Sequence, residues 1–330
     1  MREQETGTFR PLWKDIVGPS ARRWPALASD MNTEVVIIGA GITGLSTAWH
    51  LLNAGLDVVV LEADRIGHGT TGSSTGNLYA PTGCRLHAIE KKHGEDVART
   101  VAAARTSAVE FIEKRVVENL IDCDFHRVPF HLFSAPDDKA SEDVEKEFAT
   151  LQRLGMPASN SIPGTFPFQA STLATLANQA QFNPLQYVVQ LAEALAVKGC
   201  RFYEESRVLE TEDAEPCSVT TAAGSITARH IVKATHIPQG LYAIHAAMIP
   251  HREYAVLARV ENELPPPGIY WNDNPAWRYS VRPWRSAEGN FIMVLGEPHK
   301  PGEQTAEQLS RIEQFLHSRF TVTEIAYTWA

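Results

Sequence analysis

The stretch "VVIIGAGITGLSTAWHLLNAGLDVVVLEADRIG", from Val35 to Gly67, decides the fold of this chain. Val35 to Ile38 are apolar and β-branched, as expected of a strand buried on both faces of a parallel sheet. After a glycine-rich turn, apolar residues recur at helical spacing until Asn53-Ala54-Gly55 ends the helix. A second apolar run, Val58 to Leu61, leads to Glu62. This order predicts one strand–helix–strand unit with two parallel strands.

Three glycines stand between the first strand and the helix. Gly39, Gly41 and Gly44 form the pattern G-x-G-x-x-G. The first permits a tight turn, the second lets a diphosphate approach the backbone, and the third allows close helix–strand packing. The helix N-terminus adds N–H donors and the positive end of a dipole. Glu62 follows at the spacing of an acid that accepts hydrogen bonds from an adenosine ribose, so the motif predicts a dinucleotide site. The plainer alternative is a structural turn with a solvated Glu62.

A second block rich in glycine and hydroxyl side chains, "RIGHGTTGSSTG", runs from Arg65 to Gly76. A nicotinamide dehydrogenase usually continues at this point into another strand–helix unit. Small side chains and accessible backbone amides suit instead a loop that wraps a diphosphate and reaches towards an isoalloxazine ring. The block therefore favours FAD over NAD, unless it is an ordinary flexible surface loop.

Composition excludes several classes of function. The 330 residues are 44% hydrophobic and 21% charged, which indicates one large domain or two closely joined ones. The net charge of -9 and the lack of a basic run argue against nucleic-acid binding. No apolar run reaches the roughly 20 residues of a membrane span, and no signal peptide is expected. Four scattered cysteines fit neither a zinc site nor a disulfide framework, which favours the reducing cytoplasm and no metal. These are Cys84, Cys123, Cys200 and Cys217.

The rest of the chain predicts further elements. Residues 1–33 predict an extended arm anchored by Trp13 and Trp24, or a partly disordered tail. Helical patterns cover about residues 95–119, 140–154 and 184–198, the last with Asn183 as N-cap. Short alternating segments then predict a small β-meander, an antiparallel sheet and a closing helix at about residues 304–320. The meander segments are "RFYE", "RVLETED", "CSVTTAAGSITA" and "HIVKAT", and the sheet segments are "HREYAVLARV", "GIYWNDN", "RYSVRPW" and "NFIMVLGEP".

The block from Val35 to Gly76 resembles the FAD-dependent oxidoreductases of the D-amino-acid oxidase superfamily, which includes glycine, sarcosine and γ-glutamylputrescine oxidases. Further segments, such as "IDCDFHRVPFHLF" and "LGEPHKPGEQ", are similar to a subgroup often fused to a C-terminal Rieske iron–sulfur domain. The resemblance extends from about Pro11 to Trp329. It implies an α/β fold: a glutathione-reductase-type, Rossmann-like FAD domain (34–125 and 170–240) after the arm (1–33). It also implies a substrate domain with an antiparallel sheet (126–169 and 241–330).

The resemblance also implies which residues hold FAD. They comprise the glycine turn, the ribose acid and its neighbours, the second loop, a meander-strand residue beside the adenine, and two residues of the last FAD-domain strand of this portion. In that order they are Gly39, Ala40, Gly41, Ile42, Thr43 and Gly44; Glu62, Ala63, Arg65 and Ile66; Gly69, Thr70, Thr71, Ser74 and Thr75; Val208; and Ala234 and Thr235.

Relatives continue past the final "YTWA" into a D-G-x-P-x-I-G segment and a glycine-rich helix that points its N-terminus at the flavin pyrimidine. This sequence ends before that segment, and it has no Rieske C-x-H…C-x-x-H ligands. Three expectations stay open: a truncated gene, a partner chain that completes the flavin site, or a product that binds FAD weakly and catalyses poorly.

The chemistry that the resemblance implies is oxidation of the C–N bond of an amine or amino acid. FAD takes the hydride at N5, the imine hydrolyses, and oxygen or a protein acceptor receives the electrons. Two alternatives are a catalytically impaired FAD-binding subunit that needs a partner chain and an NAD-dependent dehydrogenase.

Substrate-side candidates lie on the predicted antiparallel strands and the loop after them. An arginine would clamp a carboxylate and a tyrosine would close the pocket, although each is equally a surface cation or a packed aromatic. The main candidates are Tyr254, Arg282 and His299; the others are His251, Arg252, Tyr279, Glu297 and Lys300.

Two further motifs have alternative interpretations. Strand alternation would split Asp122, Cys123, Asp124 and His126 between two faces, which argues against a metal site. His68 either tethers the flavin covalently or is solvated.

Overall fold

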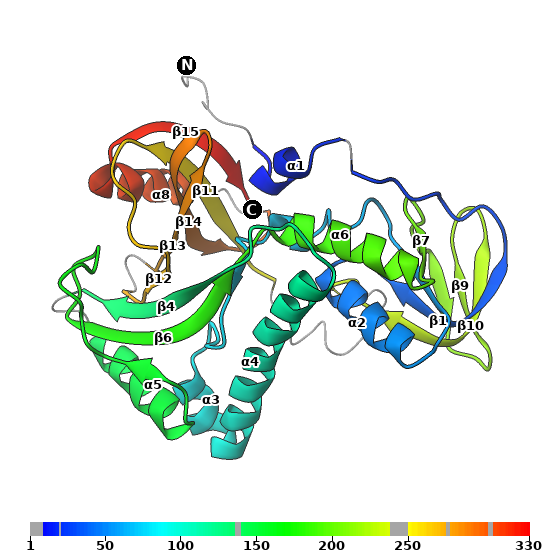
Figure 1. Cartoon of the computed structure of the whole chain (residues 1–330), viewed down its shortest axis with the longest axis horizontal. Helices are drawn as coiled ribbons and strands as arrows, with labels where there is room; N and C mark the ends of the chain where they lie inside the picture. Colours follow the sequence, from blue (N-terminus) through cyan, green and yellow to red (C-terminus); the bar gives the residue numbers. More distant parts are fainter. Residues whose placement is uncertain (1–8, 20, 136–139, 238–249, 275–277, 303–305) are drawn as a thin grey trace.

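The computed structural model describes residues 9–19, 21–135, 140–237, 250–274, 278–302 and 306–330. Two sheets organise these residues, and they lie side by side with helices around them (Figure 1). The smaller sheet has six strands in the order β7-β2-β1-β10-β9-β8. Its strands are β1 (Met31–Ile38), β2 (Val58–Leu61), β7 (Arg201–Tyr203), β8 (Glu210–Glu212), β9 (Cys217–Thr220) and β10 (Ser225–Lys233).

The predicted strand–helix–strand unit is confirmed. β1 and β2 pair in parallel from Val35–Val58 to Ile38–Leu61, and α2 (Ile42–Asn53) connects them. β1 begins at Met31, four residues earlier than expected, because its first half pairs with β10 alone and alternates between half-buried and exposed side chains. Only the second half, where β2 also pairs, is a continuous buried run. Within the predicted β-meander, β9 and β10 form an antiparallel hairpin.

One face of the six-stranded sheet is covered by α2 and α6 (Pro184–Val197). The Oδ1 atom of Asn183 accepts hydrogen bonds from the N–H groups of Leu185 and Gln186, both at 3.1 Å, so the predicted N-cap is confirmed. The arm packs as predicted at its two anchors. Trp13 is buried on the short helix α1 (Leu12–Val17), and the Trp24 ring lies 4.9 Å from that of Phe202.

The larger sheet has the order β15-β11-β14-β13-β12-β4-β6-β3, with β5 paired to β6. It is mainly antiparallel, as expected, but β12 and β4 run parallel. β6 falls inside the segment 170–240 that was assigned to the FAD domain, yet it pairs in this sheet. The strands are β3 (Asn77–Leu78), β4 (His126–Ser134), β5 (Ala158–Ser159), β6 (Thr172–Gln181), β11 (Arg252–Val260), β12 (Ile269–Asn272), β13 (Ser280–Ser286), β14 (Gly289–His299) and β15 (Val322–Trp329).

Helices pack around the larger sheet. α4 (Glu95–Glu118), α5 (Ser141–Arg153) and α8 (Ala306–Arg319) agree with the predicted helices to within two residues at their described ends. The helix α3 (Leu86–His93) was not predicted. Within the described ranges, no helix is both long and apolar enough to cross a membrane.

Strand alternation gives the β11–β15 half of the larger sheet two distinct faces. We call the back face the one on which Tyr254 and Tyr279 share a core cluster with Phe315 and other residues of α8. We call the front face the one on which Leu257 and Trp329 share a core cluster with residues of α2 and α6. The front face therefore turns towards the six-stranded sheet, and α8 covers the back face (Figure 1).

The buried His131 gives the fold a testable pH dependence. Its ring stacks on Tyr270 at 4.9 Å, its Nδ1 atom lies 2.9 Å from the Thr175 Oγ1 atom, and burial lowers its pKa from 6.5 to about 4. A histidine whose pKa is lowered in the fold stabilises the protein fully above its ordinary pKa, and this contribution is lost as the pH falls from 6.5 towards 4.

We expect His131→Gln to reduce the drop in unfolding free energy between pH 7 and pH 5 by about 2 kcal/mol. Urea titrations at the two pH values measure this drop. His317→Gln, on the exposed side of α8, is the control and should leave it unchanged. If the unfolding free energy of His131→Gln fell between pH 7 and pH 5 as much as that of the wild type, His131 would not be the source of the pH dependence.

Candidate functional site

The glycine turn joins the end of β1 to the start of α2. Gly39 has φ +105, and a Cβ atom there would lie 2.6 Å from the carbonyl oxygen of Ala234. A Cβ atom at Gly44 would lie 2.0 Å from the Gly39 carbonyl oxygen. The protein's own backbone therefore requires these two glycines.

Gly41 differs from its two neighbours in the motif. Its backbone is extended, with φ -82 and ψ -176, a conformation open to any residue. A Cβ atom there would meet only the Thr71 Oγ1 atom, at 3.1 Å, and that side chain can shift. Conformation does not require a glycine at this position, and the one packing contact is with the hydroxyl that also accepts the Ile42 N–H. A residue without a side chain leaves the backbone accessible, which a diphosphate needs in order to approach the N-terminus of α2.

Glu62 lies at the edge of this turn. Its Oε2 atom accepts a hydrogen bond from the Ala40 N–H at 2.9 Å, and its Oε1 atom accepts one from the Asp64 N–H at 3.0 Å. A carboxylate has about four acceptor positions, so these bonds fix its direction and leave capacity for ribose hydroxyls.

The second loop folds over the turn. Thr71, in the 3-10 turn Thr71–Ser73, accepts a hydrogen bond from the Ile42 N–H at 3.0 Å, and the Gly67 N–H donates to the Ala40 carbonyl at 3.0 Å. The two glycine-rich segments thus form one surface at the N-terminus of α2. His68 lies in the same loop, where burial lowers its pKa and thereby favours the neutral imidazole.

Sequence reasoning missed Glu204, a buried acid whose side chain is hydrogen-bonded to this loop. It is 3% exposed, its Oε1 atom accepts from the Ile66 N–H at 2.8 Å, and its Oε2 atom accepts from the Trp24 N–H at 3.1 Å. One buried carboxylate therefore joins the arm to the loop. Its position just after the short strand β7 is the signal that could have found it.

Three predicted cofactor residues lie outside the strands to which we assigned them. Val208 precedes β8 and packs in the core cluster of Val36 and Val219, so it is not in a meander strand. Ala234 and Thr235 follow the end of β10. Ala234 is nevertheless adjacent to the turn, because its N–H donates to the Ile38 carbonyl at 2.8 Å.

Most of the predicted substrate-side residues lie away from the loop. The Tyr254 and His299 rings stack at 4.9 Å, and Tyr254 belongs to the back-face cluster. The Tyr279 hydroxyl donates to Glu297 at 2.7 Å, and Glu297 also binds Arg311 of α8. Exposed positions are occupied by His251, Arg252 and Lys300.

Arg282 is the predicted residue that the structure brings to the loop. It projects from the front face, is 1% exposed, and its Nη1 atom donates to the carbonyls of Thr75 at 2.5 Å and Phe182 at 3.2 Å. Burial lowers its pKa to about 10, so the guanidinium stays charged at neutral pH. Its Nε and Nη2 atoms have no hydrogen-bond partner among the described residues.

A second cationic group on the front side was not predicted. Asp273, 3% exposed, accepts from Arg85 at 2.7 Å and from Arg278 at 2.9 Å, and Arg85 lies over the Trp271 ring at 5.4 Å. Trp271 is paired with Ser280 of β13, the neighbour of Arg282 on the same face. Glu253 lies within electrostatic reach of Arg278, so two guanidinium groups and two acids meet in this region.

The segment from Asp122 to His126 leads into β4, and its Cys123 contacts the start of α6. Cys123 is 1% exposed, and burial raises the pKa of its thiol to about 12. Its carbonyl accepts the Asn183 N–H at 2.7 Å, next to the N-cap of α6.

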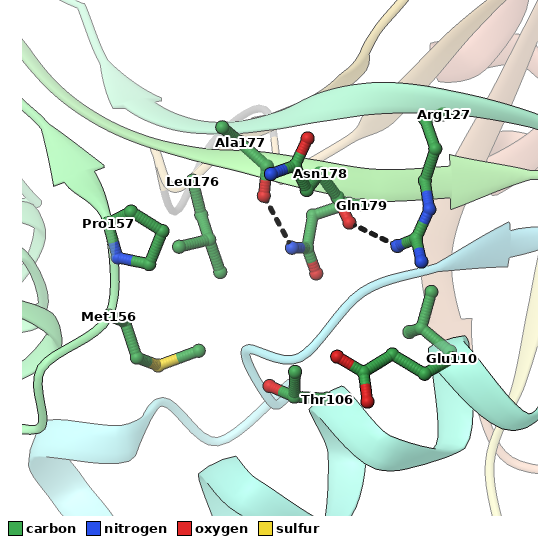
Figure 2. Close-up of a pocket in the computed structure, with 10 residues that line it drawn as sticks. Thr106, Glu110, Arg127, Met156, Pro157, Leu176, Ala177, Asn178 and Gln179 are labelled. Carbon is green, nitrogen blue, oxygen red and sulfur yellow. Dashed lines mark hydrogen bonds between the residues drawn. The ribbon is translucent and has the colours of Figure 1, made fainter.

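A pocket of about 340 Å³ lies between α4 and β6, away from the glycine turn (Figure 2). Several of its polar groups already have partners within the chain. Arg127 donates to the Asn178 carbonyl at 2.5 Å and pairs with Glu113 at 2.6 Å, and the Gln179 side chain donates to the Ala177 carbonyl at 2.8 Å. None of the residues lining it belongs to the turn or the second loop.

Comparison with solved structures identifies proteins of the same fold. Two solved structures share the fold: glycine oxidase from Geobacillus kaustophilus (TM-score 0.64, 16% identity, 90% of this chain and 81% of that one) and L-proline dehydrogenase from P. horikoshii (TM-score 0.66, 19% identity, 92% and 80%). At such identities the likeness concerns the fold alone.

Two curated relatives are more similar in sequence. The putative Rieske 2Fe-2S iron-sulfur protein YhfW of Bacillus subtilis is 31% identical over 93% of this chain and 61% of its own length. Gamma-glutamylputrescine oxidoreductase of Escherichia coli is 34% identical over 63% of this chain and 50% of its own. The chain thus spans between half and two thirds of these relatives.

The family model described as FAD dependent oxidoreductase (DAO) matches residues 34–330. The chain therefore belongs to the DAO family of FAD-dependent oxidoreductases, for which FAD is the cofactor.

Proposed function

We propose that the protein oxidises the C–N bond of an amine or amino acid. When bound, FAD accepts the hydride from the substrate carbon, the imine hydrolyses in water, and the electrons pass to oxygen or a protein acceptor. Family membership supports the redox class, and the similarity to a protein named gamma-glutamylputrescine oxidoreductase supports the C–N bond. We propose the cytoplasm as its compartment, since the four cysteines are unpaired.

The observation that carries the cofactor assignment is the joint surface that the glycine turn and the second loop form at the N-terminus of α2. The diphosphate would lie there against the first turn of α2, with Glu62 as the ribose acceptor and Thr71 beside the phosphates. Arg282 adds a buried cation with two unpaired donors beside the same loop. Such a group requires an acceptor, because an unpaired buried donor is costly.

We propose Arg278 as the substrate-side cation in place of the back-face residues. Its side chain is 57% exposed, whereas the Asp273 carboxylate that orients it is 3% exposed. The exposed Arg278 guanidinium would bind the carboxylate of an amino acid through charge-assisted hydrogen bonds. Arg282, held on backbone carbonyls, would position the loop.

Gly41→Ala and Gly44→Ala separate cofactor binding from folding. We expect Gly41→Ala to lower the unfolding temperature of the cofactor-free protein less than Gly44→Ala does, because its methyl group would press only on the Thr71 hydroxyl. It should weaken FAD binding at least tenfold, because the same methyl group lies in the approach path of the diphosphate. We expect Gly44→Ala to lower the unfolding temperature, since its methyl group would meet the Gly39 carbonyl. Calorimetric titration with FAD and thermal unfolding distinguish the two. Wild-type FAD affinity in Gly41→Ala would contradict the site.

Bleaching of the flavin tests the proposed reaction. The purified protein, loaded with FAD and kept free of oxygen, should lose its absorbance near 450 nm with at least one amine or amino acid. An NAD-dependent dehydrogenase would instead be colourless and need added nicotinamide. Stable absorbance with a broad panel of primary and secondary amines would contradict C–N oxidation and favour an FAD-binding subunit.

Arg278→Met and Arg311→Met test the substrate side as a matched pair. Both arginines are about half exposed and each pairs with one acid, but Arg311 lies on α8 behind the sheet. We expect Arg278→Met to raise the apparent Kd of a carboxylate-bearing substrate about tenfold, by loss of a charge-assisted contact. Arg311→Met should leave it unchanged. Rapid-mixing measurement of flavin reduction at several substrate concentrations gives the apparent Kd of each variant. Equal Kd values in the two variants would exclude Arg278 as the substrate-side cation.

A further inference from the structure

Three successive carbonyl groups in the second loop are held by three different parts of the chain. The Ser73 carbonyl accepts from the Trp329 indole N–H at 2.8 Å, and the Ser74 carbonyl accepts from that of Trp13 at 2.6 Å. The Thr75 carbonyl accepts from Arg282, as described above. The three donor side chains are 1–2% exposed. We call Trp13, Trp329 and Arg282 the loop clamp.

The clamp is connected internally. The Arg282 guanidinium carbon lies 5.4 Å from the centroid of the Trp13 ring, within the range of a cation–π contact. Arg282 also holds the Phe182 carbonyl, and the Phe182 N–H donates to the Gly76 carbonyl at 3.0 Å. Loss of one donor therefore also weakens the other contacts that hold this loop.

Trp13 comes from a part of the chain to which family membership assigns no role. It lies on α1, and the family model begins at residue 34. α1 is fixed to the far end of the chain as well, because the Tyr327 hydroxyl donates to Asp15 at 3.0 Å. A packing anchor needs only a buried ring, whereas the Trp13 indole also donates a directed hydrogen bond.

The clamp and the glycine turn act on the same short segment. Thr71, which accepts the N–H of the first turn of α2, is only two residues before Ser73, and both belong to one 3-10 turn. A buried carbonyl without a donor costs about 1–3 kcal/mol. Without the clamp, the loop would rotate its carbonyls towards water and carry Thr71 away from the turn.

We infer that Trp13, together with Trp329 and Arg282, positions the loop for FAD, so that the N-terminal arm is a working part of the cofactor site. Trp13 is a positioning residue, since it acts through the Ser74 carbonyl. The inference rests on the proposed contact between this loop and FAD.

Trp13→Phe tests the inference with Trp24→Phe as its control. The first variant keeps an aromatic ring in place and removes the N–H. Trp24 lies on the same arm, but its hydrogen bond to Glu204 comes from the backbone, so the second variant keeps it. Calorimetric titration should show FAD binding weakened about tenfold in Trp13→Phe and less than twofold in Trp24→Phe.

Hydrogen exchange in the cofactor-free protein gives a readout independent of FAD. Backbone amides of residues 65–79 should exchange faster in Trp13→Phe than in the wild type and in Trp24→Phe. If the wild type does not bind FAD, the proposed function fails, and the exchange comparison still decides whether the clamp orders the loop.

Trp329→Phe is the second variant, because it removes the donor to the adjacent Ser73 carbonyl. We expect it to weaken FAD binding by the same factor. Unchanged FAD affinity and unchanged exchange, in whichever of the two variants folds, would overturn the inference.

Discussion

The hydrogen bond from the Ile42 N–H to the Thr71 hydroxyl is the contact on which the rest of the site depends. It joins the first turn of α2 to a loop 29 residues further along the chain. The turn alone is a short strand–helix connection, and the loop alone is a run of small residues. Held together, they form one surface with backbone free of a side chain at Gly41 and a fixed carboxylate at Glu62. The six-stranded sheet supplies the turn, and the front face of the larger sheet holds the loop from the other side.

The sequence predicts well those features that are encoded locally. The buried half of β1, all of β2 and the Asn183 cap follow from apolar runs and capping chemistry, and the family resemblance agrees with the FAD assignment. The strand β6 was missed because "TLATLANQAQ" is rich in alanine, asparagine and glutamine, residues that do not favour strands by themselves. Its neighbours β4 and β3 make it a strand, and such pairing is not visible in a local pattern.

The substrate side shows a second limit of sequence reasoning. Alternation assigns Tyr254 and Arg282 to opposite faces, but it does not say which face turns to the cofactor. That depends on the register between β11, β13 and β14 and on the packing of α8, all of which are long-range. Arg278 and Asp273 were not predicted, because Asp273 is separated from its partner Arg85 by nearly 190 residues in the sequence. The arm presents the same difficulty: a buried Trp13 was predicted, whereas its partner carbonyl lies 61 residues away.

If the glycine turn and the clamped loop together hold FAD, the flavin should stay with the purified chain after reconstitution with excess FAD and removal of unbound cofactor on a desalting column. We expect close to one FAD for each chain, with an absorbance maximum near 450 nm, and no comparable retention of NAD. A chain that emerges colourless, or one that retains NAD and not FAD, would contradict this expectation.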